Sequence, residues 1–454
     1  MTAAAPGEAL DTQPSGDAAL RLRYLAEVSG LLWPAPARAG FGVTGGTPIA
    51  EYVLVLGAKR PRLLVPAGDR RAAAAAVRRY AEPGSARQRL MLRGLAAALS
   101  CGFGGALLGP RFRVCADAPP AGRTGPIGTI GPIGTIETYL RGALDQPASP
   151  GGRNDGLVLS LSIGPARANR KPVLQLLTPR GGTVGFAKLG INELTRTLVQ
   201  AESVALRTLA SAAPRHITVP TVLHHGRWNR LEVLVQSPLP VWLRRAGHDQ
   251  ERLGAAMLEV ARIGGVGAAR LRDSTYWIGL GERLAALGAG DGGPSVGPGA
   301  GSGVGRALRT AYERIGERAG DVRLRFGSWH GDWTPWNMAT LRDTLLVWDW
   351  ERFDHGVPLG FDAIHYAFQG AVVRDGVDPE PAAARCIEGA AGLLGPFGVT
   401  SAEPMAARLT ALLYFTDIAV RYLADKQGEG GTRLGRPRDW LLPVLAAQVE
   451  RLHP

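Results

Sequence analysis

An α+β fold built from two lobes is predicted by three observations on this sequence of 454 residues. First, residues 157–239 contain strand-like segments around a single helical segment. Second, helical periodicity dominates from residue 241 to the end, with short strand-like pieces only near 336–350. Third, strand-like and helix-like segments also precede residue 150. We therefore expect a small antiparallel sheet lobe, a helical lobe, and an extra α/β region at the N-terminus.

The sheet lobe is expected between residues 156 and 240. Its strand-like segments are LVLSLSI, PVLQLLTP and TVGFAKLG before the helical segment, and TVLHHGRW and LEVLVQSPL after it. The helical segment, 193–210, repeats apolar side chains at helical spacing, for example at Leu194, Leu198 and Leu206. The predicted order is therefore strand, strand, strand, helix, strand, strand.

The region before this lobe, residues 21–150, predicts strands and helices of its own. EYVLVLGAKRPRLLVP (51–66) is typical of two strands around a turn. GDRRAAAAAVRRY (68–80) is rich in strong helix formers, and a second helix is expected near 85–100. These segments match no motif that indicates a role for the region.

Composition marks the expected boundaries between these parts. Residues 1–20 are polar and are expected to be disordered. ASPGGRNDG (148–156) predicts a linker in front of the sheet lobe. GAGDGGPSVGPGAGSGVG (288–305) predicts a flexible insertion within the helical lobe, 241–454.

The overall composition is that of an ordinary globular protein, with 45% apolar and 20% charged residues. Three scattered cysteines exclude a disulfide framework. The N-terminus lacks the features of a signal peptide, and the longest uncharged stretch, 94–110, is too short and glycine-rich for a membrane span. A cytoplasmic location is therefore expected.

The net charge of +13 is the unusual feature. Such a charge favours anionic partners, but no nucleic-acid-binding motif accompanies it. Residues 59–93 include ten basic residues but only two acidic ones, Asp69 and Glu82. The basic residues are Lys59, Arg60, Arg62, Arg70, Arg71, Arg78, Arg79, Arg87, Arg89 and Arg93. A solvated helix face is the simpler interpretation, and a docking surface for an anionic substrate or partner is the alternative.

The strongest chemical signal is SWHGDWTPWN (328–337), called the HGD loop below. Asp332 can accept the proton of a hydroxyl that attacks a phosphoryl group. Asn337 follows five residues later, which is the spacing of a phosphotransfer loop in which the amide oxygen binds Mg²⁺. An apolar strand presents Asp349 at its end, twelve residues after Asn337, where a second metal ligand would be expected. The combination is far more specific than the loop alone.

A cation and a carboxylate precede this loop at positions that fit a nucleotide site. Lys188 ends the apolar strand TVGFAKLG, as a phosphate-binding lysine does. Glu202, fourteen residues later on the predicted helix, is the expected partner of Lys188. Glu193 is the alternative, although its place at the start of the helix favours a capping role. A surface ion pair is the non-functional interpretation of Lys188 and Glu202.

Together these motifs resemble those of the aminoglycoside phosphotransferase and choline kinase-like superfamily, which has a protein-kinase-like fold. The resemblance covers about 156–454. HGVPLGFDAIHYA resembles the segment that follows the Asp349 motif in this superfamily. It implies that Asp332 is the base, that Asn337 and Asp349 hold Mg²⁺, and that Lys188 binds ATP phosphates. It also implies that Asp362 fixes the HGD loop and that His330 supports it.

Other assignments follow from position. The nucleotide base is expected near Gln236, Ser237 and Leu239, after the strand LEVLVQ. Asp417 and Arg421 are spaced for a salt bridge within one helix. Trp329, Trp348 and Trp350 are expected to pack in the core. Trp333 and Trp336, which flank the loop residues, are candidates for the wall of an acceptor pocket.

The leading hypothesis is an ATP- and Mg²⁺-dependent phosphotransferase that acts on a hydroxyl of a small molecule, such as a sugar or a natural-product intermediate. The alternatives are a Ser/Thr kinase of a peptide precursor in a modified-peptide pathway and, with less support, a pseudokinase scaffold. Because the chain is strongly basic, a polycationic acceptor would be repelled at long range. We therefore expect a neutral or anionic acceptor rather than an aminoglycoside.

Overall fold

The computed structural model describes twelve stretches of the chain. They are residues 16–55, 61–81, 86–102, 109–116, 134–144, 156–164, 169–241, 247, 249–289, 301–399, 403–425 and 437–452. The chain divides into two compact units. Unit 1 comprises residues 1–166, 170–189 and 226–238, and unit 2 comprises 167–169, 190–225 and 239–454.

Unit 1 is organised around a nine-stranded sheet in the order β1-β4-β2-β3-β5-β6-β7-β10-β9. Every pairing from β1 to β7 is antiparallel. The strands are β1 (Ala37–Phe41), β2 (Thr47–Val55), β3 (Leu63–Pro66), β4 (Arg111–Ala116), β5 (Val158–Ser162), β6 (Val173–Leu177), β7 (Thr183–Gly190), β9 (Val222–Trp228) and β10 (Leu231–Gln236). The helices of this unit are α1 (Gly16–Leu32), α2 (Arg70–Ala81), α3 (Ala86–Ser100) and α5 (Ile136–Leu144).

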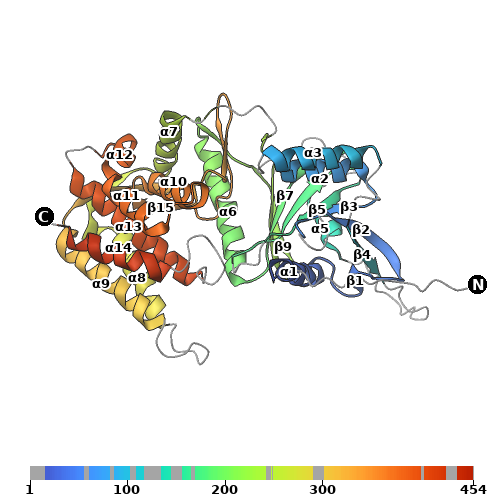
Figure 1. Ribbon diagram of the computed structural model, residues 1–454, viewed down its shortest axis with the longest axis horizontal. Coiled ribbons are helices and arrows are strands. Elements are labelled where there is room, and N and C mark those ends of the chain that lie inside the picture. Colours follow the sequence, from blue (N-terminus) through green and yellow to red (C-terminus); the bar gives the residue numbers. More distant parts are fainter. Residues whose placement is uncertain are drawn as a thin grey trace, which may run out of the picture. The chain divides into compact units, whose positions relative to one another are not determined.

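The two faces of this sheet are covered by different helices (Figure 1). On β2, Val53 and Val55 point into a core shared with α2 and α3. Their neighbour Tyr52 points the other way, because successive side chains of a strand alternate. Its hydroxyl donates a 2.9 Å hydrogen bond to the carboxylate of Glu137 on α5, which Trp33, just after α1, also contacts.

The extra N-terminal region and the expected sheet lobe form one sheet, which corrects the predicted domain division. Strand β3 pairs with β5 through Leu63↔Ser162 and Leu64↔Leu161. A pairing across this sequence separation leaves no local signal. The expectation of disorder for 1–20 is wrong from Gly16 onwards, where α1 begins, and the predicted linker at 148–156 lies almost wholly outside the described residues.

The basic residues of α2 and α3 lie largely on the surface. The exposed ones that the structure describes are Arg70, Arg71, Arg78, Arg87 and Arg93. Arg70, Arg71 and Arg78 belong to α2, whose alanine side chains pack into the core, and Arg87 and Arg93 belong to α3. Lys59 and Arg60 lie outside the described residues. A docking role for this surface stays a prediction.

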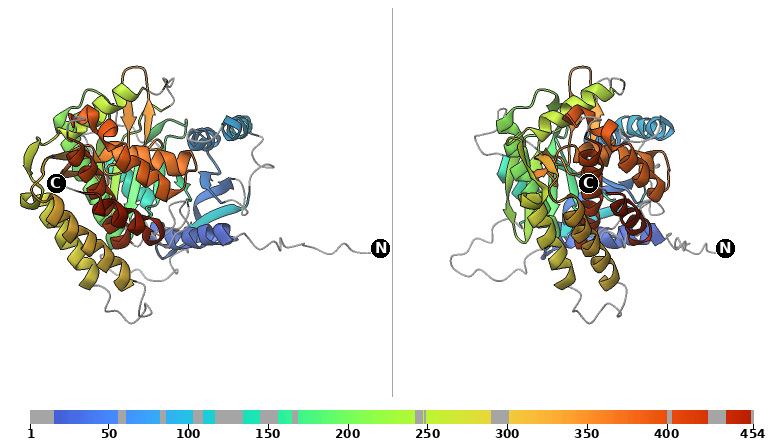
Figure 2. Two further views of the ribbon diagram at one scale, coloured as in Figure 1. Left: turned by 60° about the vertical axis from the view of Figure 1, so that its left-hand side comes forward. Right: turned by 90° about the vertical axis from the view of Figure 1, so that its left-hand side faces the viewer.

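Unit 2 contains mostly helices. They are α6 (Glu193–Ala212), α7 (Gln250–Ala261), α8 (Thr275–Ala289), α9 (Gly301–Ala319), α10 (Phe361–Gln369), α11 (Pro379–Glu388), α12 (Ala390–Leu394), α13 (Pro404–Ala424) and α14 (Pro437–Glu450). Helix α13 is buried along most of its length, and α8, α9 and α14 pack beside it (Figure 2). Aromatic contacts such as Phe368 with Phe415, at 5.1 Å between ring centroids, fill the space between α10 and α13.

Two small sheets in unit 2 carry the loops of the candidate site. One is the antiparallel sheet β11-β12-β15, formed by Gly267–Arg270, Arg323–Trp329 and Asp354–Pro358. The other is β13-β14-β8, formed by Met338–Thr340, Leu345–Val347 and Ile217–Thr218. The sequence predicts only the strand pieces near 336–350.

The predicted flexible insertion at 288–305 is wrong at both ends. Helix α8 continues to Ala289, and α9 begins at Gly301, so helix replaces loop there. Residues 290–300 lie outside the described residues. None of the helices in the described ranges is long and apolar enough to cross a membrane.

Candidate active site

The HGD loop leaves the end of β12 through a backbone turn that requires glycine. Gly331 has a φ of +80° and lies so close to Arg352 that an added Cβ would collide with the backbone of that residue. The turn redirects the chain, so that Asp332 is presented beside α10 instead of continuing the strand. The glycine between His330 and Asp332 is therefore a geometric requirement of the loop.

His330 anchors this loop from inside, as the resemblance implies. Its side chain is fully buried, with Trp350 and Trp333 against it. The backbone N–H of Asp332 donates to Nδ1 of His330 at 3.1 Å, so the ring proton must sit on Nε2. Nε2 in turn donates to the carbonyl of Trp348 at 3.1 Å. Burial lowers the pKa of His330 to about 4, which keeps the imidazole neutral.

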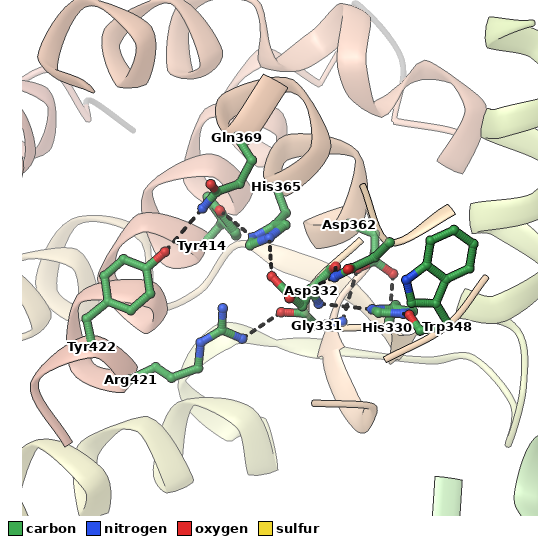
Figure 3. A network of polar contacts seen from close by, with 11 residues as sticks. His330, Gly331, Asp332, Trp348, Asp362, His365, Gln369, Tyr414, Arg421 and Tyr422 are labelled. Carbon is green, nitrogen blue, oxygen red and sulfur yellow. Dashed lines mark hydrogen bonds and ion pairs between the residues drawn. The ribbon is translucent and has the colours of Figure 1, made fainter. Parts of the chain in front are cut away.

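Asp362, in the first turn of α10, fixes the same loop, and the predicted contact is present. Its carboxylate accepts the backbone N–H of His330 at 2.7 Å and that of Gly331 at 3.1 Å. Burial raises the pKa of Asp362 to about 7, while the two N–H donors act in the opposite direction. Two successive amides of the loop are thus satisfied by one carboxylate (Figure 3).

Asp332 is held at both carboxylate oxygens. Nε2 of His365 on α10 donates to Oδ1 at 3.1 Å, and Nδ2 of Asn337 donates to Oδ2 at 2.9 Å. Burial raises the pKa of Asp332, but the hydrogen bond from His365 and the charge of Arg421 outweigh it, so the net pKa is below the ordinary value. The side chain is 36% exposed, which leaves the ionised carboxylate reachable by a ligand.

A second hydrogen bond orients His365 (Figure 3). An ionised Asp332 can only accept, so the proton of His365 is on Nε2 and Nδ1 is an acceptor. The hydroxyl of Tyr414 on α13 lies 2.8 Å from Nδ1 and is the matching donor. Burial lowers the pKa of His365, consistent with a neutral ring.

The hairpin β13–β14 explains why Asn337 and Asp349 are twelve residues apart. The strands pair through Met338↔Val347, and the N–H of Trp348 donates to the carbonyl of Asn337 at 3.1 Å. Asn337 therefore comes just before the hairpin and Asp349 just after it, so both residues lie at the same end of the hairpin. Asp349 has a φ of 74°, a left-handed conformation that costs a non-glycine residue about 1–3 kcal/mol and is commonest at functional sites.

Three carboxylates of unit 2, those of Glu202, Asp349 and Glu351, lie close together and are called the acidic group below. One oxygen each from Glu202, Asp349 and Glu351 lies within 4.8 Å of the others. Glu202 is completely buried, and Glu351 is 9% exposed. A close group of carboxylate oxygens is a donor set that hard divalent cations such as Mg²⁺ prefer. The residues therefore fit a metal, and Glu351 joins those that the sequence singles out.

The residues expected to bind nucleotide are found at the predicted elements. Lys188 is buried on β7, and Gln236 is the last, buried residue of β10. Leu239 packs with Val241 against the β13–β14 hairpin. Glu202 is buried on α6, whereas Glu193 is exposed in its first turn beside the Asn192 cap. The meeting of Lys188 with Glu202 and the nucleotide roles of Gln236, Ser237 and Leu239 stay predictions.

A cavity of about 820 Å³ in unit 2 lies next to this site. Its wall includes Ala201 of α6, Glu351 of the acidic group, Arg283 of α8 and Arg421 of α13. Arg421 donates a 2.6 Å hydrogen bond to the carbonyl of Gly331, so one residue of the cavity wall is tied to the HGD loop. Its size is that of a pocket for a small organic ligand.

The tryptophans are arranged differently from the prediction. Trp333 is fully buried against His330, and Trp336 is 42% exposed. Trp329 is buried as predicted, and it also lines the cavity. Trp350 is in the core as predicted, and Trp348 packs at the edge of the cluster around Leu346.

The predicted salt bridge between Asp417 and Arg421 is wrong. Asp417 instead receives two hydrogen bonds from Arg283 of α8, at 2.8 and 3.1 Å. Arg421 turns towards the HGD loop. A bidentate guanidinium from another helix satisfies the carboxylate better than a neighbour one turn away.

Comparisons with known proteins give structural likenesses alone. No protein-family model matches the sequence, and no curated protein matches it. Among solved structures, a thermostable mutant of aminoglycoside phosphotransferase APH(4)-Ia with ADP and hygromycin B is 16% identical, with 69% of this chain and 98% of that chain covered and a TM-score of 0.40.

Two further solved structures have other described activities. A choline/ethanolamine kinase family protein from Mesorhizobium loti is 16% identical over 69% of this chain and 99% of its own, with a TM-score of 0.37. Amicoumacin kinase in complex with AMP-PNP, Ca²⁺ and its ligand is 12% identical over 70% and 94%, with a TM-score of 0.39.

Proposed function

We propose that this protein is an ATP- and Mg²⁺-dependent phosphotransferase that transfers the γ-phosphoryl group of ATP to a hydroxyl of a small molecule. The observation that carries the proposal is the setting of Asp332. Its carboxylate is ionised, partly exposed, and held at both oxygens by His365 and Asn337. Asp332 lies in the same loop as Asn337, and the hairpin that follows this loop leads back to Asp349 of the acidic group.

In the proposed reaction Asp332 accepts the hydrogen bond and then the proton of the acceptor hydroxyl. The acceptor oxygen forms a bond to the γ-phosphorus, the bond from that phosphorus to the bridging oxygen of ADP breaks, and the proton remains on Asp332. His365 holds the carboxylate in one orientation, so little reorganisation is needed. His330 and Asp362 keep the loop in place through backbone contacts.

The proposed metal ligands are Asn337 and Asp349, with Glu351 beside them. A bound Mg²⁺ would neutralise phosphate charge and orient the γ-phosphoryl group. The amide nitrogen of Asn337 donates hydrogen bonds to Asp332, so the amide oxygen is the proposed ligand atom. Lys188 is proposed to bind the nucleotide phosphates with Glu202 as its partner, and Gln236, Ser237 and Leu239 to line the position of the base.

A small acceptor is favoured over a peptide by the cavity beside the HGD loop. A volume of about 820 Å³ is within the range of pockets that enclose drug-sized ligands, roughly 300–1,000 Å³. The arrangement of Asp332, Asn337 and the acidic group supports an enzyme over a pseudokinase scaffold, because it fits the base and the metal ligands that a phosphotransfer site needs.

The test is incubation of the purified protein with γ-labelled ATP, Mg²⁺ and pools of small hydroxyl compounds. The proposal expects label in an organic product, and the dependence of that label on Mg²⁺. Asp332→Asn is the matched control, because it keeps the shape of the side chain and removes the proton acceptor. Nucleotide binding without transfer to any hydroxyl, in the pools or in peptides, would reject the proposed function.

A further inference from the structure

The cavity beside the HGD loop is lined by three arginines with different partners. Arg283 donates two hydrogen bonds to Asp417, at 2.8 and 3.1 Å. Arg352 forms an ion pair with Asp425. In both cases a carboxylate compensates the guanidinium charge, so these two arginines are accounted for within the fold.

Arg421 differs from the other two. Arg421 donates a 2.6 Å hydrogen bond to the neutral carbonyl oxygen of Gly331, and its guanidinium carbon lies 5.7 Å from the ring of Trp329 and 5.9 Å from that of Tyr422. Within the described parts of the chain, no salt bridge joins Arg421 to a carboxylate. Asp332 and Asp362 feel its charge through space, but neither pairs with it directly.

The remaining charged groups of the cavity do not change this picture. Glu351 belongs to the acidic group that suits a metal. Asp354 is exposed at the start of β15, and its carboxylate accepts the backbone N–H of His355. The imidazole of His355 is 2.6 Å from the hydroxyl of Ser328. Among these charged groups, the guanidinium of Arg421 is the one that lines the cavity and is hydrogen-bonded to the HGD loop.

We propose that Arg421 binds an anionic group of the acceptor, a carboxylate or a phosphate, and so selects the substrate class of this enzyme. This inference rests on the proposed function. A guanidinium has five N–H donors in a planar fork that matches the oxygens of both groups, and the Gly331 carbonyl and two ring faces leave that fork incompletely used. A partly desolvated charge of this kind is best matched by an anion.

The position of Arg421 also connects binding to chemistry. Its hydrogen bond to Gly331 ties the guanidinium to the residue before Asp332. An acceptor held by its anionic group at Arg421 would therefore have a hydroxyl a few bonds away placed near Asp332. An acceptor with several ammonium groups would instead be repelled by Arg421, and its charges would find Asp417 and Asp425 already paired.

The experiment compares probes that differ in charge and little else: glycerol, glycerate and glycerol 3-phosphate. Their binding to the full-length protein, loaded with Mg²⁺ and a non-hydrolysable ATP analogue, is measured by ligand-observed NMR titration. We expect at least one anionic probe to bind about tenfold or more tightly than glycerol. Arg421→Gln is expected to abolish that difference, and Arg421→Lys to restore part of it.

Arg314→Gln is the matched control, because it removes the same charge from an exposed ion pair with Glu450 on α14. It should keep the preference of the wild type. Circular dichroism and thermal unfolding check that each variant folds. Equal binding of the three probes, no binding of either anionic probe, or a preference that survives in Arg421→Gln would each overturn the inference. The carboxylate and phosphate arms show which anion is recognised.

Failure of this inference is distinguishable from failure of the proposed function. Label transfer from ATP to neutral acceptors, together with no preference for anionic probes, would leave the phosphotransferase standing and remove the role of Arg421. A preference for anionic probes without any transfer to a hydroxyl would support anion binding by Arg421 and reject the phosphotransferase function.

Discussion

Nε2 of His365 lies 3.1 Å from Oδ1 of Asp332, and this contact ties α10 to the HGD loop. This hydrogen bond holds the Asp332 carboxylate in the orientation that the proposed reaction needs. Because Tyr414 fixes the tautomer of His365 from the opposite side, the three side chains form a chain of donors that ends at Asp332.

Replacement of His365 is expected to slow turnover without removing nucleotide binding. One lost charge-assisted hydrogen bond corresponds to roughly 1.5–3 kcal/mol, or about 10- to 100-fold in rate. His365→Ala should therefore lower kcat by about that factor, and Tyr414→Phe should have a smaller effect. Steady-state kinetics on an acceptor found in the pools check this. A kcat for His365→Ala equal to that of the wild type would show that the contact does not serve the reaction.

The acidic group is expected to control metal-dependent nucleotide binding. Asp349→Ala removes one carboxylate from the group with Glu202 and Glu351, so affinity for Mg²⁺–ATP should fall by at least about tenfold. Isothermal titration with ATP in the presence and absence of Mg²⁺ measures this. Asp343→Ala, at an exposed turn between β13 and β14, is the control and should bind like the wild type. Undiminished Mg²⁺-dependent binding in Asp349→Ala would place the metal elsewhere.

Stability should depend on the neutral form of His330. The folded pKa is about 4 and the ordinary value is 6.5, so the unfolded chain binds the proton first. The contribution of neutral His330 is therefore complete above pH 6.5 and is lost as the pH falls towards 4. A difference of about 2.5 pH units at ~1.4 kcal/mol each amounts to about 3 kcal/mol.

Denaturant unfolding of the wild type and His330→Gln between pH 7 and pH 4 tests this. The stability advantage of the wild type should shrink as the pH is lowered through this window. Asp362 contributes in the opposite direction, because its raised pKa of about 7 makes its contribution fade as the pH rises, but it is present in both proteins. A constant advantage across the window would mean that His330 titrates normally.

Much of the site was predictable because local spacing determines it. The HGD loop, Asn337 and Asp349 are brought together by one short hairpin, and a spacing of twelve residues is enough to anticipate that. The strands of β5, β6, β7 and β10 and the helix α6 follow from alternation and helical periodicity. Glu351 was missed, although it stands two residues after Asp349 in the same motif.

The rest depends on packing between distant segments. His365 reaches Asp332 from the face of α10, and Arg421 reaches Gly331 from α13, ninety residues along the chain. Helical spacing predicted Asp417, one turn away, as the partner of Arg421. That pattern cannot show that Arg283 of α8 binds Asp417 instead. The pairing of β3 with β5 is equally invisible to local patterns.

An aminoglycoside is not expected to be the acceptor. The chain carries a net charge of +13, and Arg421 faces the cavity next to the HGD loop. Incubation of the protein with ATP, Mg²⁺ and a panel of kanamycin-like compounds should give no phosphorylation above the rate without an acceptor. Efficient phosphorylation, or resistance conferred on a sensitive host, would contradict the expected acceptor charge.

The most direct measurement compares the wild type with Asp332→Asn in transfer of labelled phosphoryl from ATP to an acceptor. Asparagine keeps the shape of the side chain and can still accept one of the two hydrogen bonds from His365 and Asn337, but it cannot take the hydroxyl proton. We therefore expect kcat to fall by at least ~10² while the affinity for ATP changes little. That result would support Asp332 as the base of a phosphotransferase. Wild-type turnover by Asp332→Asn on the same acceptor would contradict the central assignment.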